Sequence, residues 1–206
     1  NKNWLLQYGF HYSTTGNTPR YDRLIEYASN VLRFAEWNYG PQTWLMHNLQ
    51  LQHTKASTLY SNLRLTVAYQ DNEESRIDRR RNNNNRRTQT EHVQALSINV
   101  DVEKILSTKA TIFYGVEFID NAIGSFANTQ NINTQVQTAI ATRYPNNSTW
   151  NSYAAYASYK NNVSNKSTIS AGLRYNHVAI KAPFDTTFLK FPFTDANLKT
   201  SAITGN

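Results

Sequence analysis

Apolar and polar side chains alternate one by one along much of this chain. Every second residue is apolar or aromatic in five segments: 4–13, 62–70, 94–103, 110–118 and 168–176. This period-two pattern is typical of β-strands that present one apolar and one polar face. Two weaker runs, 43–53 and 149–160, bring the predicted number of strands to about seven.

The alternation also assigns residues to faces. Val100 and Leu65 fall on the apolar side of their strands, and Asn99 falls on the polar side. In the run 149–160 the spacing of Tyr153, Tyr156 and Tyr159 leaves the facing open. Tyrosines near the ends of apolar faces are typical of the aromatic girdles that mark membrane interfaces, as at Tyr8, Tyr12, Tyr69 and Tyr175.

The predicted connections alternate between short and long. Short polar turns are expected near 54–58, 107–109 and 161–166, and long connections at 15–41, 71–88, 120–148 and from 182 onward. Because hairpin strands reverse direction, all short turns fall at one end of the sheet and all long loops at the other. Soluble domains rarely contain repeated structureless loops beyond ~12–15 residues, whereas outer-membrane β-barrels combine this asymmetry with strands of ~9–11 residues.

The sequence therefore predicts an all-β fold, an antiparallel meander that forms part of a large transmembrane β-barrel. In lipid every backbone N–H and C=O must be paired, so a spanning sheet has to close. About seven strands cannot close such a barrel, and the chain begins inside a predicted strand without a recognisable signal peptide. We therefore expect residues 1–206 to be a fragment. A soluble sheet with one solvated face is the alternative that alternation alone leaves open.

Composition agrees with a membrane β-sheet. Apolar residues make up 39% of the chain and aromatic residues 13%, with no cysteine. The low apolar content suits a sheet in which only every second residue faces lipid. The net charge is +7, but the segment 76–87 alone contributes +5 of it. The basic character is therefore local, and it does not indicate a general nucleic-acid-binding surface.

Several motifs resemble those of TonB-dependent outer-membrane receptors, in the form common in Bacteroidetes-type bacteria. The matching stretches are PRYDRL (19–24), FAEWNYGPQ (34–42), YQDNEESRIDRR (69–80), YGVEFIDN (114–121), RYP (143–145) and GLRY (172–175). The resemblance covers most of the chain, and the first two motifs are its most specific part.

The resemblance implies a 22-stranded barrel filled by an N-terminal plug domain. Such receptors lie in the bacterial outer membrane, contact its lipid, bind a scarce small-molecule nutrient and import it with energy delivered by the TonB complex through the plug. Siderophore-bound iron, haem, cobalamin and glycans are the expected nutrient classes. The plug and the remaining strands are absent from this sequence, so these properties belong to the parent protein.

The arginine- and asparagine-rich segment 76–87 is the main candidate for ligand contact. If it forms a loop over the barrel mouth, Arg76, Arg79, Arg80, Arg81, Arg86 and Arg87 are available to an anionic ligand or to lipopolysaccharide phosphates. The alternative is a solvated loop, or salt bridges to Asp71, Glu73 and Glu74. In the predicted loop 15–41, Trp37 and Tyr39 are the candidates for an aromatic binding lid, unless they only pack the loop against itself.

No catalytic, cofactor or metal site is expected. The five histidines lack the spacing of a ligand set. Asp101, Glu103 and Glu117 fall on polar faces of neighbouring strands, where we expect them to pair with Arg64 and Arg174 or with the plug rather than to perform acid–base chemistry. The alternatives to a receptor are a passive porin-type barrel and a soluble basic β-sheet protein that binds nucleic acid.

Overall fold

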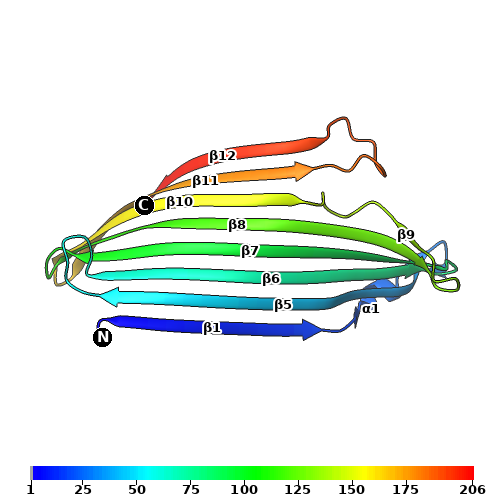
Figure 1. Cartoon of the computed structure of the whole chain (residues 1–206), viewed down its shortest axis with the longest axis horizontal. Helices are drawn as coiled ribbons and strands as arrows, with labels where there is room; N and C mark the ends of the chain where they lie inside the picture. Colours follow the sequence, from blue (N-terminus) through cyan, green and yellow to red (C-terminus); the bar gives the residue numbers. More distant parts are fainter. Residues whose placement is uncertain (1) are drawn as a thin grey trace.

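Among residues 2–206, all the long strands belong to one antiparallel sheet, and no second layer packs on it. The computed structural model describes residues 2–206 and contains eight long strands that are neighbours in chain order (Figure 1). Their bounds are Trp4–Thr15 (β1), Phe34–Thr54 (β5), Asn62–Arg80 (β6), Asn85–Ile105 (β7), Ala110–Asn131 (β8), Ser148–Ser164 (β10), Ser167–Pro183 (β11) and Asp195–Gly205 (β12). Among the described residues, no helix is long and apolar enough to span a membrane.

Short elements occupy the connections. The β1–β5 connection contains β2 (Thr18–Pro19), helix α1 (Tyr21–Leu24), β3 (Tyr27–Ala28) and β4 (Val31–Leu32), and β9 (Gln137–Ala139) follows β8. β2 pairs with β5 and β9 with β8, so both extend the main sheet locally.

The antiparallel meander predicted from the sequence is confirmed, with eight long strands rather than seven. The additional strand is β12, which lies in the region expected to be a long connection. Its sequence, DANLKTSAITG, does not alternate cleanly between apolar and polar residues. Pairing with β11 along its whole length, from Leu173–Gly205 to Pro183–Asp195, defines it instead.

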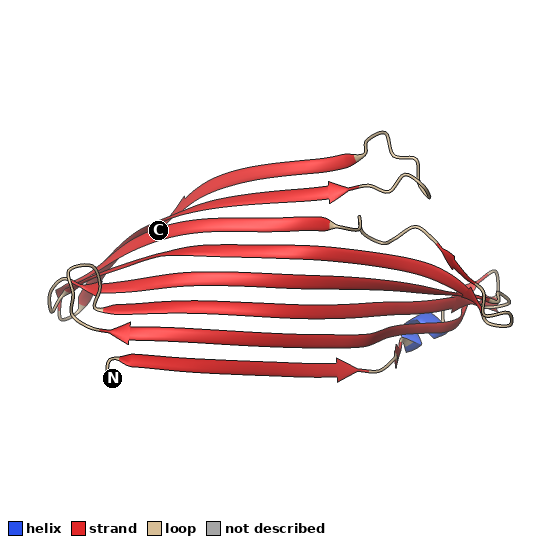
Figure 2. Ribbon diagram, viewed as in Figure 1, coloured by secondary structure: helices blue, strands red, loops and turns tan. Residues whose placement is uncertain are grey.

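The two ends of the sheet differ as expected, with one exception. The short turns 55–61, 106–109 and 165–166 lie together at one end, termed the turn end, and the long connections lie at the opposite loop end (Figure 2). The predicted long loop 71–88 does not exist, because β6 runs to Arg80 and β7 begins at Asn85.

Asparagine makes the tight β6–β7 turn possible. Asn82 has φ 59°, in the left-handed region that asparagine tolerates better than most residues. The Asn83 side-chain oxygen then accepts a 2.8 Å hydrogen bond from the Asn85 backbone N–H. The asparagine run is therefore the turn, and most of the flanking arginines lie on strand ends.

Cross-strand register places all the predicted apolar faces on one side of the sheet. Directly paired residues of an antiparallel ladder share a face. One such row consists of Leu6, Leu51, Leu65, Val100, Val116, Ala155, Tyr175 and Ile203. We term this side the apolar face and the other the polar face. Tyr153 and Tyr159 belong to the apolar face and Tyr156 to the polar face, which resolves the ambiguity in the sequence.

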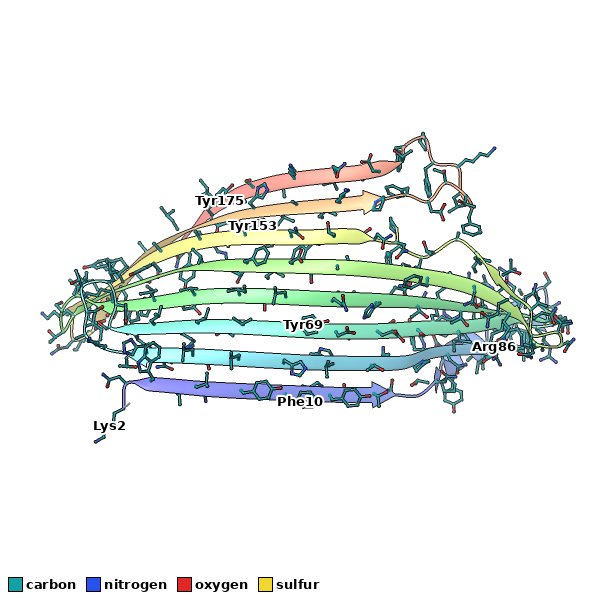
Figure 3. The ribbon with its side chains drawn as sticks, viewed as in Figure 1. Lys2, Phe10, Tyr69, Arg86, Tyr153 and Tyr175 are labelled. Atoms are coloured by element: carbon teal, nitrogen blue, oxygen red, sulfur yellow. The ribbon has the colours of Figure 1, made fainter. Side chains whose placement is uncertain are left out.

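The apolar residues form an oblique band across the strands. Its loop-end boundary lies at Tyr12 on β1, Tyr69 on β6, Tyr153 on β10 and Tyr175 on β11, and Figure 3 labels the last three. Relative to the rows of paired residues, this boundary shifts by about one residue per strand. A shift of ~3.3 Å along the strand for every ~4.8 Å across it corresponds to a tilt of roughly 35°. Strands of outer-membrane barrels tilt by about 35–45°.

Tyrosines at both edges of the band make polar contacts. At the loop end, the Tyr69 hydroxyl donates to Asp71 at 3.3 Å, and at the turn end the Tyr114 hydroxyl donates to the Leu59 carbonyl at 2.8 Å. An aromatic ring in the apolar band with its hydroxyl bonded beyond it is the arrangement of membrane-interface girdles.

The facing of mid-band residues can be tested in the intact parent protein. Val100 lies in the band between Leu65 and Val116, so Val100→Arg is expected to cost about 2–4 kcal/mol of folding free energy in lipid. Asn99→Arg, one residue away on the polar face, is expected to be much milder. Denaturant titrations of both variants in liposomes measure the difference, and equal losses would contradict the assigned faces.

Candidate functional site

Most buried side chains lie at the loop end of the sheet, beyond the apolar band. Those on the polar face are Phe34, Trp37, Asp78, Gln89, Ser125 and Ser148, whereas Asn38 and Ser75 lie on the other face. The connections 16–33 and 132–147 contact the polar face there. The loop end of the polar face is therefore the part of the chain with a built, partly enclosed surface.

A β-bulge brings Trp37 and Tyr39 to the polar face. The register shifts between the pairs Tyr39–Arg76 and Gln42–Glu74, so β5 has one more residue than β6 in this interval. The phase of alternation therefore changes, and residues 37 and 39 share the face of Arg76. Gly40 is required in the bulge, because its φ is +92° and an added Cβ would collide with the Gly16 carbonyl oxygen.

Trp37 and Tyr39 therefore lie on strand β5 and not, as expected, in a loop. Their rings meet edge to face, with centroids 4.8 Å apart. Trp37 is only 7% exposed, because side chains from β6 and from the α1 segment cover it.

Three arginines surround these two rings. The guanidinium of Arg76 lies 5.4 Å from the Trp37 centroid and 5.3 Å from that of Tyr39, and Arg20 lies 5.4 and 5.0 Å from the same rings. Arg23 lies 6.0 Å from Trp37. These distances are within the range of cation–π interactions, so the rings hold the three positive charges close together. We term these five residues the arginine–aromatic cluster.

Arg76 retains donor capacity. Its Nε is buried and has no hydrogen-bond partner among residues 2–206. Arg20 differs, because its Nε donates to Asp22 at 2.7 Å. Arg76 is thus the member of the cluster whose guanidinium is least satisfied by the chain itself.

A buried carboxylate lies near Arg76. Glu91 on β7 is directly opposite Glu74 on β6, and both its oxygens lack a hydrogen-bond partner among the described residues. Burial raises the pKa of Glu91 and the charge of Glu74 raises it further, whereas Arg143 and Arg76 act in the opposite direction. Arg143 is within 3.9 Å of the Glu91 carboxylate.

Arg143 belongs to a connection that folds onto the polar face. The neighbouring Tyr144 N–H donates to the Ser125 hydroxyl at 3.3 Å, and the Ser125 N–H donates to the Asn146 side chain at 2.9 Å. Ser125 is completely buried by these contacts. The segment 143–146 is therefore fixed against the polar face at the loop end, which we term the mouth.

The other predicted arginines are dispersed and are not grouped in a loop. Arg79, Arg80, Arg86 and Arg87 lie on strand ends, and only Arg81 is in the turn. Arg87 pairs with Asp78 at 2.7 Å and Arg86 with Glu36 at 3.0 Å. The acidic partners are therefore not Asp71, Glu73 and Glu74, because the long strands place those carboxylates further down the sheet. Figure 3 labels Arg86 at the loop end.

Within the level of the apolar band, the polar face carries charged groups that bond to one another. Arg174 pairs with Glu117 at 2.8 Å, as the sequence predicted, and Asn99 donates to Glu117 at 3.2 Å. Asp101 does not pair with Arg64, because it accepts a 2.7 Å hydrogen bond from Tyr156 instead. Arg64 remains exposed on this wall.

Sequence reasoning missed Arg20, Arg23 and Arg143 as members of the mouth. Arg20 and Arg23 lie within the motif PRYDRL, and Arg143 is the first residue of RYP. The motifs therefore included these arginines, but the sequence did not indicate that they lie at the loop end of the polar face. Among residues 2–206, no three His, Asp or Glu side chains are grouped to hold a metal ion.

Comparison with known proteins identifies the type of sheet. The profile of the outer membrane protein beta-barrel family matches residues 47–198. Nineteen chains of solved structures match, among them the copper transporter OprC, with a TM-score of 0.69 and 12% sequence identity. The match covers 82% of this chain and 27% of the OprC chain, so this chain spans about a quarter of that protein, and the likeness concerns the fold alone. No curated protein matches.

The packing of the α1 segment on Trp37 can be tested by proteolysis of the parent protein in intact cells. Trp37→Ala removes the ring that Arg20 and Arg23 cover, so trypsin cleavage at Arg23 and Arg33 is expected to accelerate at least tenfold, which corresponds to about 1.4 kcal/mol of lost local stability. Trp44→Ala on the same strand is the control and should leave the cleavage rate unchanged. Unchanged cleavage in Trp37→Ala would contradict the packing.

Proposed function

Because this chain belongs to the outer membrane protein beta-barrel family and lies in the bacterial outer membrane, we propose that its parent is a TonB-dependent receptor. In this proposal residues 1–206 form one arc of the barrel wall, and a plug domain and further strands complete the parent protein. The receptor captures a scarce nutrient at the loop end, which faces the cell exterior, and imports it with TonB-coupled energy. The chain makes and breaks no bond and holds no cofactor.

The charged wall at membrane depth is the observation that carries the proposal. The polar face, which lines the lumen, carries Arg64, Asp101, Glu117 and Arg174 at the level of the apolar band. Their bonds join wall residues to one another, and Arg64 is left exposed. Such a wall suits a polypeptide plug that supplies complementary charges and hydrogen bonds. The motifs that resemble TonB-dependent receptors support the same proposal.

The passive porin-type barrel has one observation in its favour. The connections 16–33 and 132–147 fold onto the polar face, and inward loops constrict porin channels. Here, however, their contacts lie beyond the apolar band, at the level of Trp37 and Ser125. They narrow the mouth rather than the middle of the barrel, which favours ligand capture.

We propose that Arg76, Trp37 and Tyr39 on the polar face contact the ligand, and that Arg87, which pairs with Asp78, adds positive charge beside them. The guanidinium of Arg76, which lies against two rings and pairs with no carboxylate of residues 2–206 within hydrogen-bond distance, binds an anionic group of the nutrient. Arg79, Arg80, Arg81 and Arg86 lie around the strand ends, where their charge attracts anions to the mouth.

Dependence on TonB tests the proposal. A strain that lacks the parent gene is compared with wild type on limiting iron–siderophore, haem, cobalamin or polysaccharide. We expect a growth defect on one nutrient class, restored by the gene on a plasmid but not in a strain without TonB. Restoration that persists without TonB and in the presence of a proton uncoupler would instead establish the passive alternative.

The role of Arg76 is tested with Arg79 as the matched control. Both arginines are on β6 within three residues, but they lie on opposite faces. Arg76→Gln is expected to lower the affinity for the nutrient at least tenfold, because a charge-assisted hydrogen bond is lost. Arg79→Gln should change it less than twofold, and equal effects in whole-cell binding assays would contradict an assignment to the polar face.

A further inference from the structure

A second surface on the polar face is built for a different chemistry from that of the arginine–aromatic cluster. It is a groove of about 490 Å³ lined by Trp44, Gln70, Asn72, Val93, Ala95 and Asn121, from strands β5 to β8. The groove forms because the small side chain of Ala95 faces Gln70 on one side and Asn121 on the other.

The groove lies at the exterior edge of the apolar band. Asn72 follows Asp71 and Asn121 follows Asp120, the first charged residues beyond the band on their strands. Trp44 neighbours Leu45, which faces lipid at the same level. A ligand that has passed the arginine–aromatic cluster therefore meets this groove next.

No charged side chain lines the groove, but amides do. The Trp44 indole N–H donates to the Gln70 side-chain oxygen at 3.2 Å, which leaves the Gln70 NH₂ group to donate. The Asn121 NH₂ group donates to the Trp150 carbonyl at 3.1 Å, which leaves its oxygen to accept. The Asn72 amide has no hydrogen-bond partner among residues 2–206. The groove thus offers both donors and acceptors without a net charge.

Trp44 provides a fixed aromatic surface beside these amides. Its side chain is 36% exposed and His11 packs against it, with ring centroids 4.5 Å apart and the planes tilted by 53°. The contact with His11 and the hydrogen bond to Gln70 together restrict rotation of the indole. An aromatic wall with a few convergent polar groups is the usual composition of a small-molecule site.

We infer that this groove is a sugar-ring subsite and that the imported nutrient is a short acidic oligosaccharide, an inference that rests on the proposed function. Hydroxyl groups donate and accept, so they match the amides of Gln70, Asn72 and Asn121, and the C–H face of the ring packs on Trp44. Neither an anionic nor a cationic ring finds a counter-charge here.

The acidic part follows from the neighbouring cluster. Arg76 lies on the same face of β6 as Asn72, four residues closer to the loop end, which is about 13 Å along the strand. One ligand that contacts both places carries an anionic group and a neutral hydroxylated ring about that distance apart. A short oligosaccharide with uronate groups has both features.

The test uses the full-length receptor in detergent micelles and calorimetric titration. The probes are the trisaccharides glucuronosyl-xylobiose and its 4-O-methyl form, in which one uronate ring is linked to two neutral xylose rings, with the neutral trisaccharides xylotriose and cellotriose for comparison. We expect micromolar or tighter binding of at least one uronate-containing trimer and at least tenfold weaker binding of the neutral trimers. Trp44→Ala should weaken uronate binding at least tenfold, whereas Trp44→Phe, which keeps an aromatic ring, should lose less than threefold.

Each contrary result overturns the inference. Uronate binding that is unchanged in Trp44→Ala would show that the sugar ring does not pack on Trp44. Equal binding of neutral and acidic trimers would refute the acidic assignment, and binding of neither would refute the sugar class. The proposed function is judged separately by TonB-dependent growth, so a receptor that imports another nutrient with TonB would refute only this inference.

Discussion

The backbone of this sheet has to satisfy its hydrogen bonds where no water is available, and the rest of the structure follows from that constraint. In hydrocarbon every N–H and C=O must pair within the protein, so each strand needs a partner along its whole length. The ladders run continuously from β1 to β12 and pair the six inner strands on both sides, whereas β1 and β12 each have a partner on one side only. The side chains then determine which face of the sheet contacts lipid and which contacts water. A second layer would cover the apolar face, and none is present among residues 2–206, so Leu96, Ile98, Ile112 and Leu173 remain available to lipid.

This constraint also explains which parts of the fold could be predicted from the sequence. Within the band, lipid on one side and a polar lumen on the other enforce strict alternation, and residues such as Leu65, Val100 and Val116 were assigned to the correct face. Beyond the band, both faces meet water, and alternation is no longer required. The sequence of the loop-end halves of β6 and β7 does not alternate, so a loop over residues 71–88 was predicted there. In the structure the ladder of β6 and β7 continues to the pair Asp78–Arg87.

The candidate site was harder to predict for a second reason. A period-two pattern assigns residues to faces only as far as the next β-bulge. The extra residue at the Gly40 bulge exchanges the faces of odd- and even-numbered residues in β5. Trp37 and Tyr39 could be recognised as aromatic candidates from composition, but their face could not. Arg20, directly before helix α1, and Arg23, within it, both contact Trp37, a tertiary contact that local patterns do not encode.

The loop end of the polar face contains buried polar atoms that residues 2–206 leave without hydrogen-bond partners. A buried polar group without a partner costs about 1–3 kcal/mol, and a charged group costs more. Arg76 and Glu91 both have buried atoms in this state, although the sheet has few buried apolar side chains to offset the cost. The neighbouring arginines Arg86 and Arg87, by contrast, are paired with carboxylates of the chain. These unsatisfied atoms lie where the bulge and the two connections enclose the polar face, next to the residues for which ligand contact is proposed.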